Sequence, residues 1–179
     1  MVKKVLKIAL IVIGCLIAAP FLALGVSALI PSPQVSIPVG NHSSYNPSSF
    51  WHPWGDHKHR GVDLFAKSGT EIKAAMPGVV IFTMEHFGAG GRVAAVLGPS
   101  GRIYYYAHMD EIKCHMAQIV TRETVIGTVG NSGNAQNTPA HLHFSILSLW
   151  EQTDHCKHDE RRKLWCINPV VEFKGAPNY

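Results

Sequence analysis

Two histidines separated by a single residue occur in the run His141-Leu142-His143. On a β-strand, residues i and i+2 point to the same face and lie about 6–7 Å apart. Two imidazoles in that arrangement can converge on one metal ion or one substrate. The alternative is a pair of surface histidines that flank a core leucine, and this motif alone leaves both open.

A second group of candidate ligands is His59 and Asp63, which lie four residues apart with Gly61 between them. In a fully extended chain their Cα atoms would be about 13 Å apart, near the limit for sharing an ion. A bend at Gly61 shortens that distance, and glycine bends at the lowest conformational cost. Histidine nitrogen and aspartate oxygen bind zinc at about 2.0–2.2 Å. Taken alone, the pair is more typical of an ordinary protein surface than of a metal site.

A third candidate is His108, which closes the run Tyr104-Tyr105-Tyr106-Ala107. A catalytic zinc has three protein ligands and one open position. His59, Asp63 and one histidine of the His-x-His pair supply three ligands, which leaves the other histidine and His108 for proton transfer. No His-Glu-x-x-His motif occurs in the sequence, so a histidine has to replace the usual glutamate base.

In this order along the chain, the motifs resemble those of the lysostaphin/LytM-type zinc metallopeptidases. The resemblance covers about residues 51–169, and it rests on five runs: His59-Arg60-Gly61-Val62-Asp63-Leu64, Gly69 to Ala75 with Gly78-Val79-Val80, Tyr106-Ala107-His108-Met109, Ile126 to Gly133, and Thr138-Pro139-Ala140-His141-Leu142-His143-Phe144.

The resemblance implies a β-sheet groove and one zinc ion held by His59, Asp63 and His143. It implies His108 and His141 as the catalytic histidines. It further implies peptide-bond hydrolysis in bacterial cell-wall peptidoglycan, with stem peptides or crossbridges as the substrate. Family members that serve as activators lack some of these residues, whereas all five are present here.

These roles define an expected mechanism. Zinc-activated water attacks the scissile carbonyl, with His141 as general base and His108 stabilising the oxyanion or protonating the leaving amine. The roles of the two histidines are open to exchange. Two other functions are weighed against this one: a non-catalytic wall-binding or activator protein on the same fold, and a metal-sensing surface protein. The sequence leaves open which bond is cut and whether a protein activator exists.

Short runs of β-formers between turn signals predict strands at 78–83, 93–97, 102–108, 124–129 and 141–146. A turn at 98–101 predicts that the second and third form a hairpin. No window of ten or more residues in this region has a strong helical period. The prediction is an all-β, antiparallel sheet, as a sandwich or half-open barrel, preceded by one N-terminal hydrophobic helix.

The N-terminal segment has the composition of an export signal or membrane anchor. Residues 8–30 carry no charge and follow Lys3, Lys4 and Lys7, which favours a cytoplasmic N-terminus and an extracytoplasmic domain. An uncleaved anchor and a signal peptide cleaved after Ala28 both remain open. The predicted organisation is an anchor or signal at 1–30, a Pro/Ser-rich linker at 31–49, a metallopeptidase domain at 50–173 and a tail at 174–179.

Charge and cysteines complete the prediction. The net charge of +4 owes much to the three N-terminal lysines, and the near-neutral body argues against a nucleic-acid partner. A polar insert at residues 151–164 is longer than the family resemblance leads us to expect, and Cys156 and Cys166 bracket a short polar loop in this region. In an oxidising compartment they are expected to form a disulfide. A second metal site that includes His155 and His158 is the alternative, and Cys114 has no assigned partner.

Overall fold

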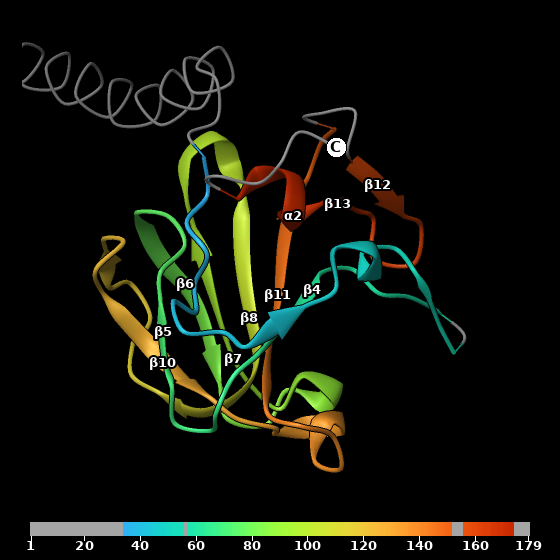
Figure 1. Cartoon of the computed structure of the whole chain (residues 1–179). Coiled ribbons are helices and arrows are strands. Elements are labelled where there is room, and N and C mark those ends of the chain that lie inside the picture. The colour runs from blue at the N-terminus through green and yellow to red at the C-terminus, as the bar shows by residue number, and fades with distance from the viewer. Residues whose placement is uncertain (1–33, 56, 152–155, 174–179) are drawn as a thin grey trace, which may run out of the picture. The chain divides into compact units, whose positions relative to one another are not determined.

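Antiparallel strands dominate the regular secondary structure in the computed structural model, which describes residues 34–55, 57–151 and 156–173 (Figure 1). The strands are β1 (Ser44–Tyr45), β2 (Pro53–Trp54), β3 (His57–Lys58), β4 (Val62–Phe65), β5 (Glu71–Lys73), β6 (Gly78–Met84), β7 (Arg92–Leu97), β8 (Ile103–Ile112), β9 (Ile119–Val120), β10 (Val125–Val129), β11 (His141–Ser148), β12 (Cys156–Asp159) and β13 (Leu164–Ile167). Short 3-10 turns η1 to η4 (Pro47–Ser49, Gly88–Gly90, Pro99–Gly101 and Gly133–Ala135) and the single-turn helix α2 (Pro169–Glu172) complete the described elements.

The main sheet has the strand order β1-β4-β11-β8-β7-β6-β9. Two branches leave it: β10 joins β8 to β5, and β13 joins β11 to β12. A separate two-stranded hairpin, β2–β3, precedes β4. The pairings among these strands are antiparallel, and within the described residues the sheet does not close into a barrel.

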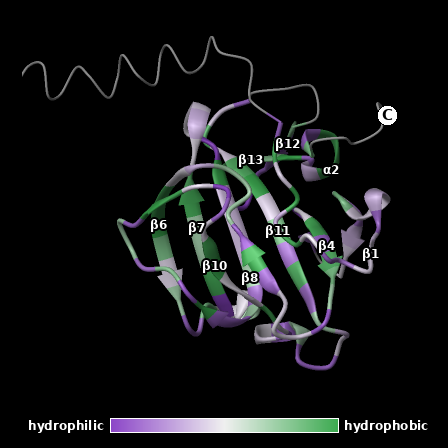
Figure 2. Cartoon of the chain, turned by 60° about the vertical axis from the view of Figure 1, so that its left-hand side comes forward, coloured by the Kyte–Doolittle hydropathy of each residue, from purple (hydrophilic) through white to green (hydrophobic). Residues whose placement is uncertain are grey.

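The two faces of the sheet differ in chemistry. Along β11, Leu142, Phe144 and Ile146 have no exposed surface and pack with Leu64 of β4 and Tyr106 of β8 in the main core. The alternate residues of β11 point to the opposite face. Hydrophobic and hydrophilic residues alternate along the strands in Figure 2. The hydrophobic face holds the fold together, and the other face is available for chemistry.

The predicted antiparallel β class is confirmed, and each of the five predicted strands overlaps an observed one, β6, β7, β8, β10 or β11. The predicted hairpin is also present, since β7 pairs with β8 and Val96 lies opposite Tyr104. Sequence reasoning did not identify the short strands β1 to β5, β9, β12 and β13. The predicted N-terminal helix lies outside the described residues. In the described part of the chain, no helix is long and apolar enough to cross a bilayer.

Part of the segment assigned to a linker contributes to the core. Val35 and Val39 have no exposed surface, and the backbone N–H of Val35 donates to the carbonyl of Glu172. Val35 also forms a bridge with Phe173. The Pro- and Ser-rich composition concealed this role because two isolated valines give no periodic signal. The apolar side chains nevertheless cover one edge of the core.

The polar insert forms the β12–β13 hairpin, which extends the sheet from β11. The prediction of a disulfide between Cys156 and Cys166 is wrong, because no disulfide joins them in the described part of the chain. Cys156 lies opposite Ile167 and Cys166 lies opposite Lys157, so the two cysteines are one position out of register. Adjacent positions on a strand face opposite sides, and Cβ atoms that point apart are incompatible with disulfide geometry. Cys114 is half-buried beside the core.

Candidate metal centre and active site

Strand pairing brings the first two candidate ligands together. Residue His143 of β11 lies directly opposite Asp63 of β4 and Ala107 of β8. Directly opposed residues in an antiparallel pair have Cβ atoms about 4.5–5.5 Å apart. The imidazole and the carboxylate therefore extend from one face of the sheet toward a common point, while Leu142 and Phe144 face the core.

The third candidate ligand comes from the segment between β3 and β4. His59 reaches the same point because the chain bends at Gly61 against the backbone of β11. A Cβ atom at Gly61 would lie 2.2 Å from the carbonyl oxygen of Phe144 and 2.6 Å from Oγ of Ser145. Only glycine permits this approach, so the bend expected at Gly61 has a steric reason as well as a conformational one.

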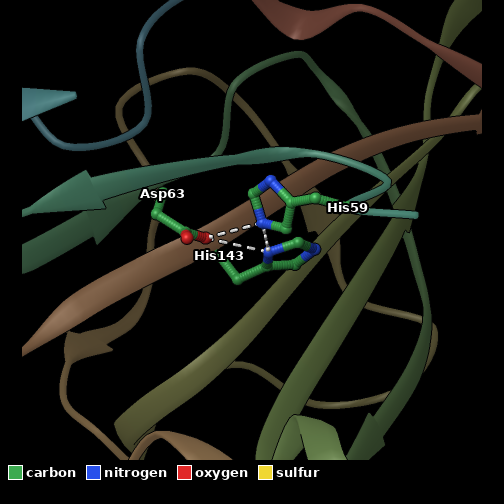
Figure 3. A group of neighbouring side chains, drawn as sticks. All are labelled: His59, Asp63 and His143. Atoms are coloured by element: carbon green, nitrogen blue, oxygen red, sulfur yellow. Dashed lines mark hydrogen bonds and ion pairs between the residues drawn. The ribbon is translucent and has the colours of Figure 1, made fainter. Parts of the chain in front are cut away.

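The side chains of His59, Asp63 and His143 form a compact cluster, drawn as sticks in Figure 3. Nε2 of His59 lies 3.1 Å from Oδ1 of Asp63 and 3.0 Å from Nδ1 of His143. Nδ1 of His143 lies 2.9 Å from the same carboxylate oxygen. Two imidazole nitrogens and one carboxylate oxygen at this spacing match the donor set of a catalytic zinc.

The other ring nitrogen of each of these histidines has its own partner. Nδ1 of His59 donates to the carbonyl of Ser49 at 3.1 Å, which leaves Nε2 as the ligand atom. Nε2 of His143 lies 3.0 Å from Oγ of Ser145, which leaves Nδ1 toward the cluster. Such outer partners fix the orientation of metal-binding imidazoles. The donor atoms therefore suit one zinc ion, and the outer hydrogen-bond partners hold both imidazoles in a ligating orientation.

The electrostatics of the cluster favour a cation. Burial opposes ionisation of Asp63, but hydrogen bonds from His143 and His59 outweigh it and hold the pKa of this carboxyl well below its ordinary value. Burial lowers the pKa of His143 despite the nearby carboxylate. For His59 burial acts in the same direction, yet the hydrogen bond and charge of Asp63 raise its pKa overall. The site thus presents an ionised carboxylate beside two imidazoles.

The two remaining candidate histidines lie beside the cluster. The ring of His108 is 5.0 Å from that of His141 and 5.9 Å from that of His143, measured between centroids. Nε2 of His141 is 4.0 Å from Oδ1 of Asp63. All five residues expected from the sequence are therefore gathered at one place on the sheet.

Backbone carbonyls determine which ring nitrogen of each neighbouring histidine carries the proton. Nδ1 of His108 lies 2.9 Å from the carbonyl oxygen of Ser132, and Nδ1 of His141 lies 2.8 Å from that of Pro139. A carbonyl only accepts, so Nδ1 is the protonated nitrogen in each case. In the neutral form each ring therefore has an unprotonated Nε2, which can accept a proton.

His108 also has an unusual backbone conformation, with φ of 63° within β8. Few non-glycine residues adopt a positive φ, and such strain is concentrated at functional sites. The pairing register of β8 with β10 shifts at the next residue, Met109. Burial, followed by the charge of His143, lowers the pKa of His108 to about 4, so its ring is neutral at pH 7.

Several supporting residues were not identified from the sequence. Ser145 and Ser132 each contact one of the histidines, but isolated serines give no sequence signal. The side chain of Arg60, next to ligand candidate His59, forms an ion pair with Asp159 of the β12–β13 hairpin. The side chain of Asp159 is only 5% exposed. The polar insert thus anchors the segment that carries His59.

Fold and site together define an antiparallel β-sheet protein with a three-donor metal centre. Residues 57–155 match the model of peptidase family M23. The chain therefore belongs to peptidase family M23, which contains the lysostaphin/LytM-type enzymes that the sequence motifs resemble.

Individual relatives agree with this membership. Over 89 residues the chain is 33% identical to peptidoglycan DD-endopeptidase ShyA of Vibrio cholerae, a match that covers 50% of this chain and 20% of that protein. Over 111 residues it is 31% identical to DD-carboxypeptidase/endopeptidase Mpg of Neisseria meningitidis, and the match covers 62% of this chain and 24% of that protein. The matched region is thus about a fifth to a quarter of these curated relatives.

Solved structures show the same fold. The catalytic domain of the antimicrobial peptidase lysostaphin from Staphylococcus simulans aligns with a TM-score of 0.54 and 25% identity, over 60% of this chain and 81% of that one. A zinc-containing peptidase from Vibrio cholerae aligns with a TM-score of 0.52 and 27% identity, over 63% of this chain and 36% of that one.

Proposed function

We propose that this protein is a zinc-dependent endopeptidase that hydrolyses peptide bonds of bacterial peptidoglycan. The observation that carries the proposal is the gathering of five residues: three donors within hydrogen-bonding distance, and two further histidines beside them. The curated relatives named above are a peptidoglycan endopeptidase and a carboxypeptidase/endopeptidase, which supports the substrate class. Non-catalytic relatives would not need His108 and His141 in addition to the metal cluster.

In this proposal His59 Nε2, Asp63 Oδ1 and His143 Nδ1 hold the zinc ion. When bound, zinc supplies a Lewis acid that polarises a carbonyl and lowers the pKa of a water molecule. Ser49 and Ser145 keep the two ligand imidazoles oriented. The depressed pKa of Asp63 keeps its carboxylate charged throughout the neutral range.

His141 is proposed as the general base. Its Nδ1–H is held by the carbonyl of Pro139, so the lone pair on Nε2 faces the cluster and can accept a proton from water. In the same way, the Nδ1–H of His108 is held by the carbonyl of Ser132, which leaves Nε2 of His108 unprotonated. A neutral ring whose only N–H is already engaged cannot donate at Nε2, so His108 has to gain a proton first. The source of that proton is the water from which His141 removes it, so His108 is proposed to protonate the leaving amine only after that transfer.

We further propose that the substrate lies in a groove on this face of the sheet, in a domain of about residues 50–173 outside the cytoplasmic membrane. A cleft of about 460 Å³ is lined in part by Arg92, Ser132 and Gly133, and the carbonyl of Ser132 contacts Nδ1 of His108, which supports a groove near the site. Export rests on the apolar segment 8–30 and its preceding lysines, either as an anchor in the membrane or as a cleaved signal.

Digestion of purified peptidoglycan tests the proposal. The zinc-loaded protein should release muropeptides whose masses identify the cut bond, and the reaction should stop when a chelator removes the metal. His108→Ala, which keeps the three proposed ligands, serves as the matched catalytic control. Unchanged peptidoglycan after incubation with zinc-loaded wild type would contradict the proposed activity.

A further inference from the structure

The β12–β13 hairpin is a direct extension of the strand that carries His143. β13 pairs with β11, where Ile167 lies opposite Ile146 and Trp165 lies opposite Ser148. β12 then pairs with β13 along its whole length. The hydrogen bonds of an antiparallel ladder fix each strand relative to the next. The turn of the hairpin therefore has a set position relative to His143.

Asp159 is the last residue of β12, and the turn that follows holds it in place. Its carbonyl accepts from the backbone N–H groups of Arg162, at 3.2 Å, and Lys163, at 2.8 Å. Its Oδ1 accepts from the backbone N–H of Arg161 at 3.1 Å, the bond to the backbone two residues on that is common for aspartates in turns. One carboxylate oxygen is thus engaged locally, and the other, Oδ2, is left for a distant partner.

That partner is Arg60, whose Nε donates to Oδ2 of Asp159 in an ion pair with little access to solvent. The side chains of Arg60 and Asp159 are 15% and 5% exposed. Burial opposes ionisation of Asp159, but the hydrogen bond and the charge of Arg60 outweigh it and lower its pKa. Salt screens such a pair little, and loss of one partner leaves a buried charge without compensation. The pair is therefore a firm link between the hairpin and Arg60.

His59 is the candidate ligand that depends most on such a link. Asp63 and His143 lie on the paired strands β4 and β11, whereas His59 lies in the segment between β3 and β4. On one side, the backbone of His59 exchanges hydrogen bonds with residues 51–52. On the other side, Arg60 follows directly, and its ion pair ties the segment to β12. The position of His59 relative to the two ligands on strands therefore depends on both contacts.

We propose that the β12–β13 hairpin positions the metal ligand His59, with Asp159 acting through Arg60. Both Asp159 and Arg60 are positioning residues, and neither is assigned as a ligand or as a catalyst. The inference rests on the proposed zinc site and gives a cause for its geometry, because the hairpin joins the strand of His143 to the segment of His59. The three donors are thus held near one another before zinc binds.

Zinc affinity tests the proposal, measured on the full chain after removal of metal and in competition with a chromogenic chelator. Asp159→Asn should weaken zinc binding by about tenfold or more, as is usual when a ligand loses its outer support, although all three donors remain. Asp159→Glu keeps the carboxylate and should recover most of the lost affinity. Glu172→Gln is the matched control, because it breaks a similarly buried pair with Arg102, and it should bind zinc as the wild type does even at lower stability.

A double variant keeps the test decisive if Asp159→Asn folds poorly. Arg60→Met combined with Asp159→Asn leaves no unpaired buried charge, and the amide oxygen can still accept from the backbone N–H of Arg161. This variant should unfold near the wild-type denaturant concentration and still bind zinc about tenfold more weakly. Wild-type affinity in either Asp159→Asn variant, or an equal loss of affinity in Glu172→Gln, would overturn the positioning role. A wild-type chain that binds no zinc would instead overturn the proposed function.

Discussion

At the scale of single residues, the site depends on partners that orient the histidines as much as on the histidines themselves. His143 is placed by its register opposite Asp63, but its ring is turned by Oγ of Ser145, 3.0 Å from Nε2. Sequence spacing predicted that His141 and His143 share a strand face. It could not predict which ring nitrogen faces the metal, because that depends on a serine two residues further along β11.

Replacing Ser145 by alanine should weaken zinc binding by about 10- to 100-fold, the usual effect of losing an outer partner of a metal ligand. The loss follows because Nε2 of His143 no longer has its 3.0 Å contact. Competition with a chromogenic chelator measures the affinity. Ser68→Ala, at an exposed turn, should bind zinc as the wild type does. Equal affinity in the Ser145 variant would show that the contact does not support the ligand.

The protonation state of His108 is a second prediction at this scale. Burial lowers its pKa to about 4, so the neutral ring should persist at all pH values above that and protonate only as the pH falls through it. An ordinary histidine would titrate near 6.5. An NMR titration of the ring protons, assigned with His108→Gln, gives the midpoint directly. A midpoint at or above 6.5 would contradict the neutral proton acceptor described here.

At the scale of elements, the bend between β3 and β4 decides whether His59 and Asp63 can act together. The sequence predicted this bend from Gly61, and it predicted the longer apolar strands of the sheet. It could not predict that the polar insert forms β12–β13, because that hairpin is held by a long-range ion pair between Arg60 and Asp159. Local patterns identify strands, whereas contacts between residues distant in sequence assemble the site.

Substituting Gly61 by alanine should destabilise the fold by about 1–3 kcal/mol and reduce zinc occupancy. The added Cβ would lie 2.2 Å from the carbonyl oxygen of Phe144, so the bend has to move away from β11. Chemical denaturation and elemental analysis measure the two effects. Gly40→Ala is the control, because nothing lies within 4 Å of a Cβ at that position. Wild-type stability and zinc content in Gly61→Ala would refute the steric argument.

At the scale of the whole molecule, one antiparallel sheet packs the core on one face and carries the candidate site residues on the other. The family resemblance in the sequence gave the five site residues, because their order and spacing were intact. Burial of Val35 and Val39 and the arrangement of Cys156 and Cys166 depended on packing that composition does not encode. The N-terminal segment 8–30 lies outside the described residues, and its role remains the export prediction.

A reporter fused after Tyr179 tests that prediction. An alkaline phosphatase fusion should be active, and a fluorescent protein that folds only in the cytoplasm should be dark. Deleting residues 1–30 should reverse both signals, because the lysines and the charge-free segment are then absent. A full-length fusion with only cytoplasmic activity would contradict the export of this chain.

The central claim is that three residues bind the metal and two others act on the substrate, and zinc content per chain tests it most directly. Elemental analysis of the purified variants separates the two classes without knowledge of the bond that is cut. His59→Ala, Asp63→Ala and His143→Ala should lose the ion and with it all activity. His108→Ala and His141→Ala should stay folded with nearly one zinc per chain, yet lose turnover by about 10²-fold or more. If His141→Ala empties the site while His143→Ala stays full, or if all five variants keep their zinc, the assignment of ligands and catalysts is wrong.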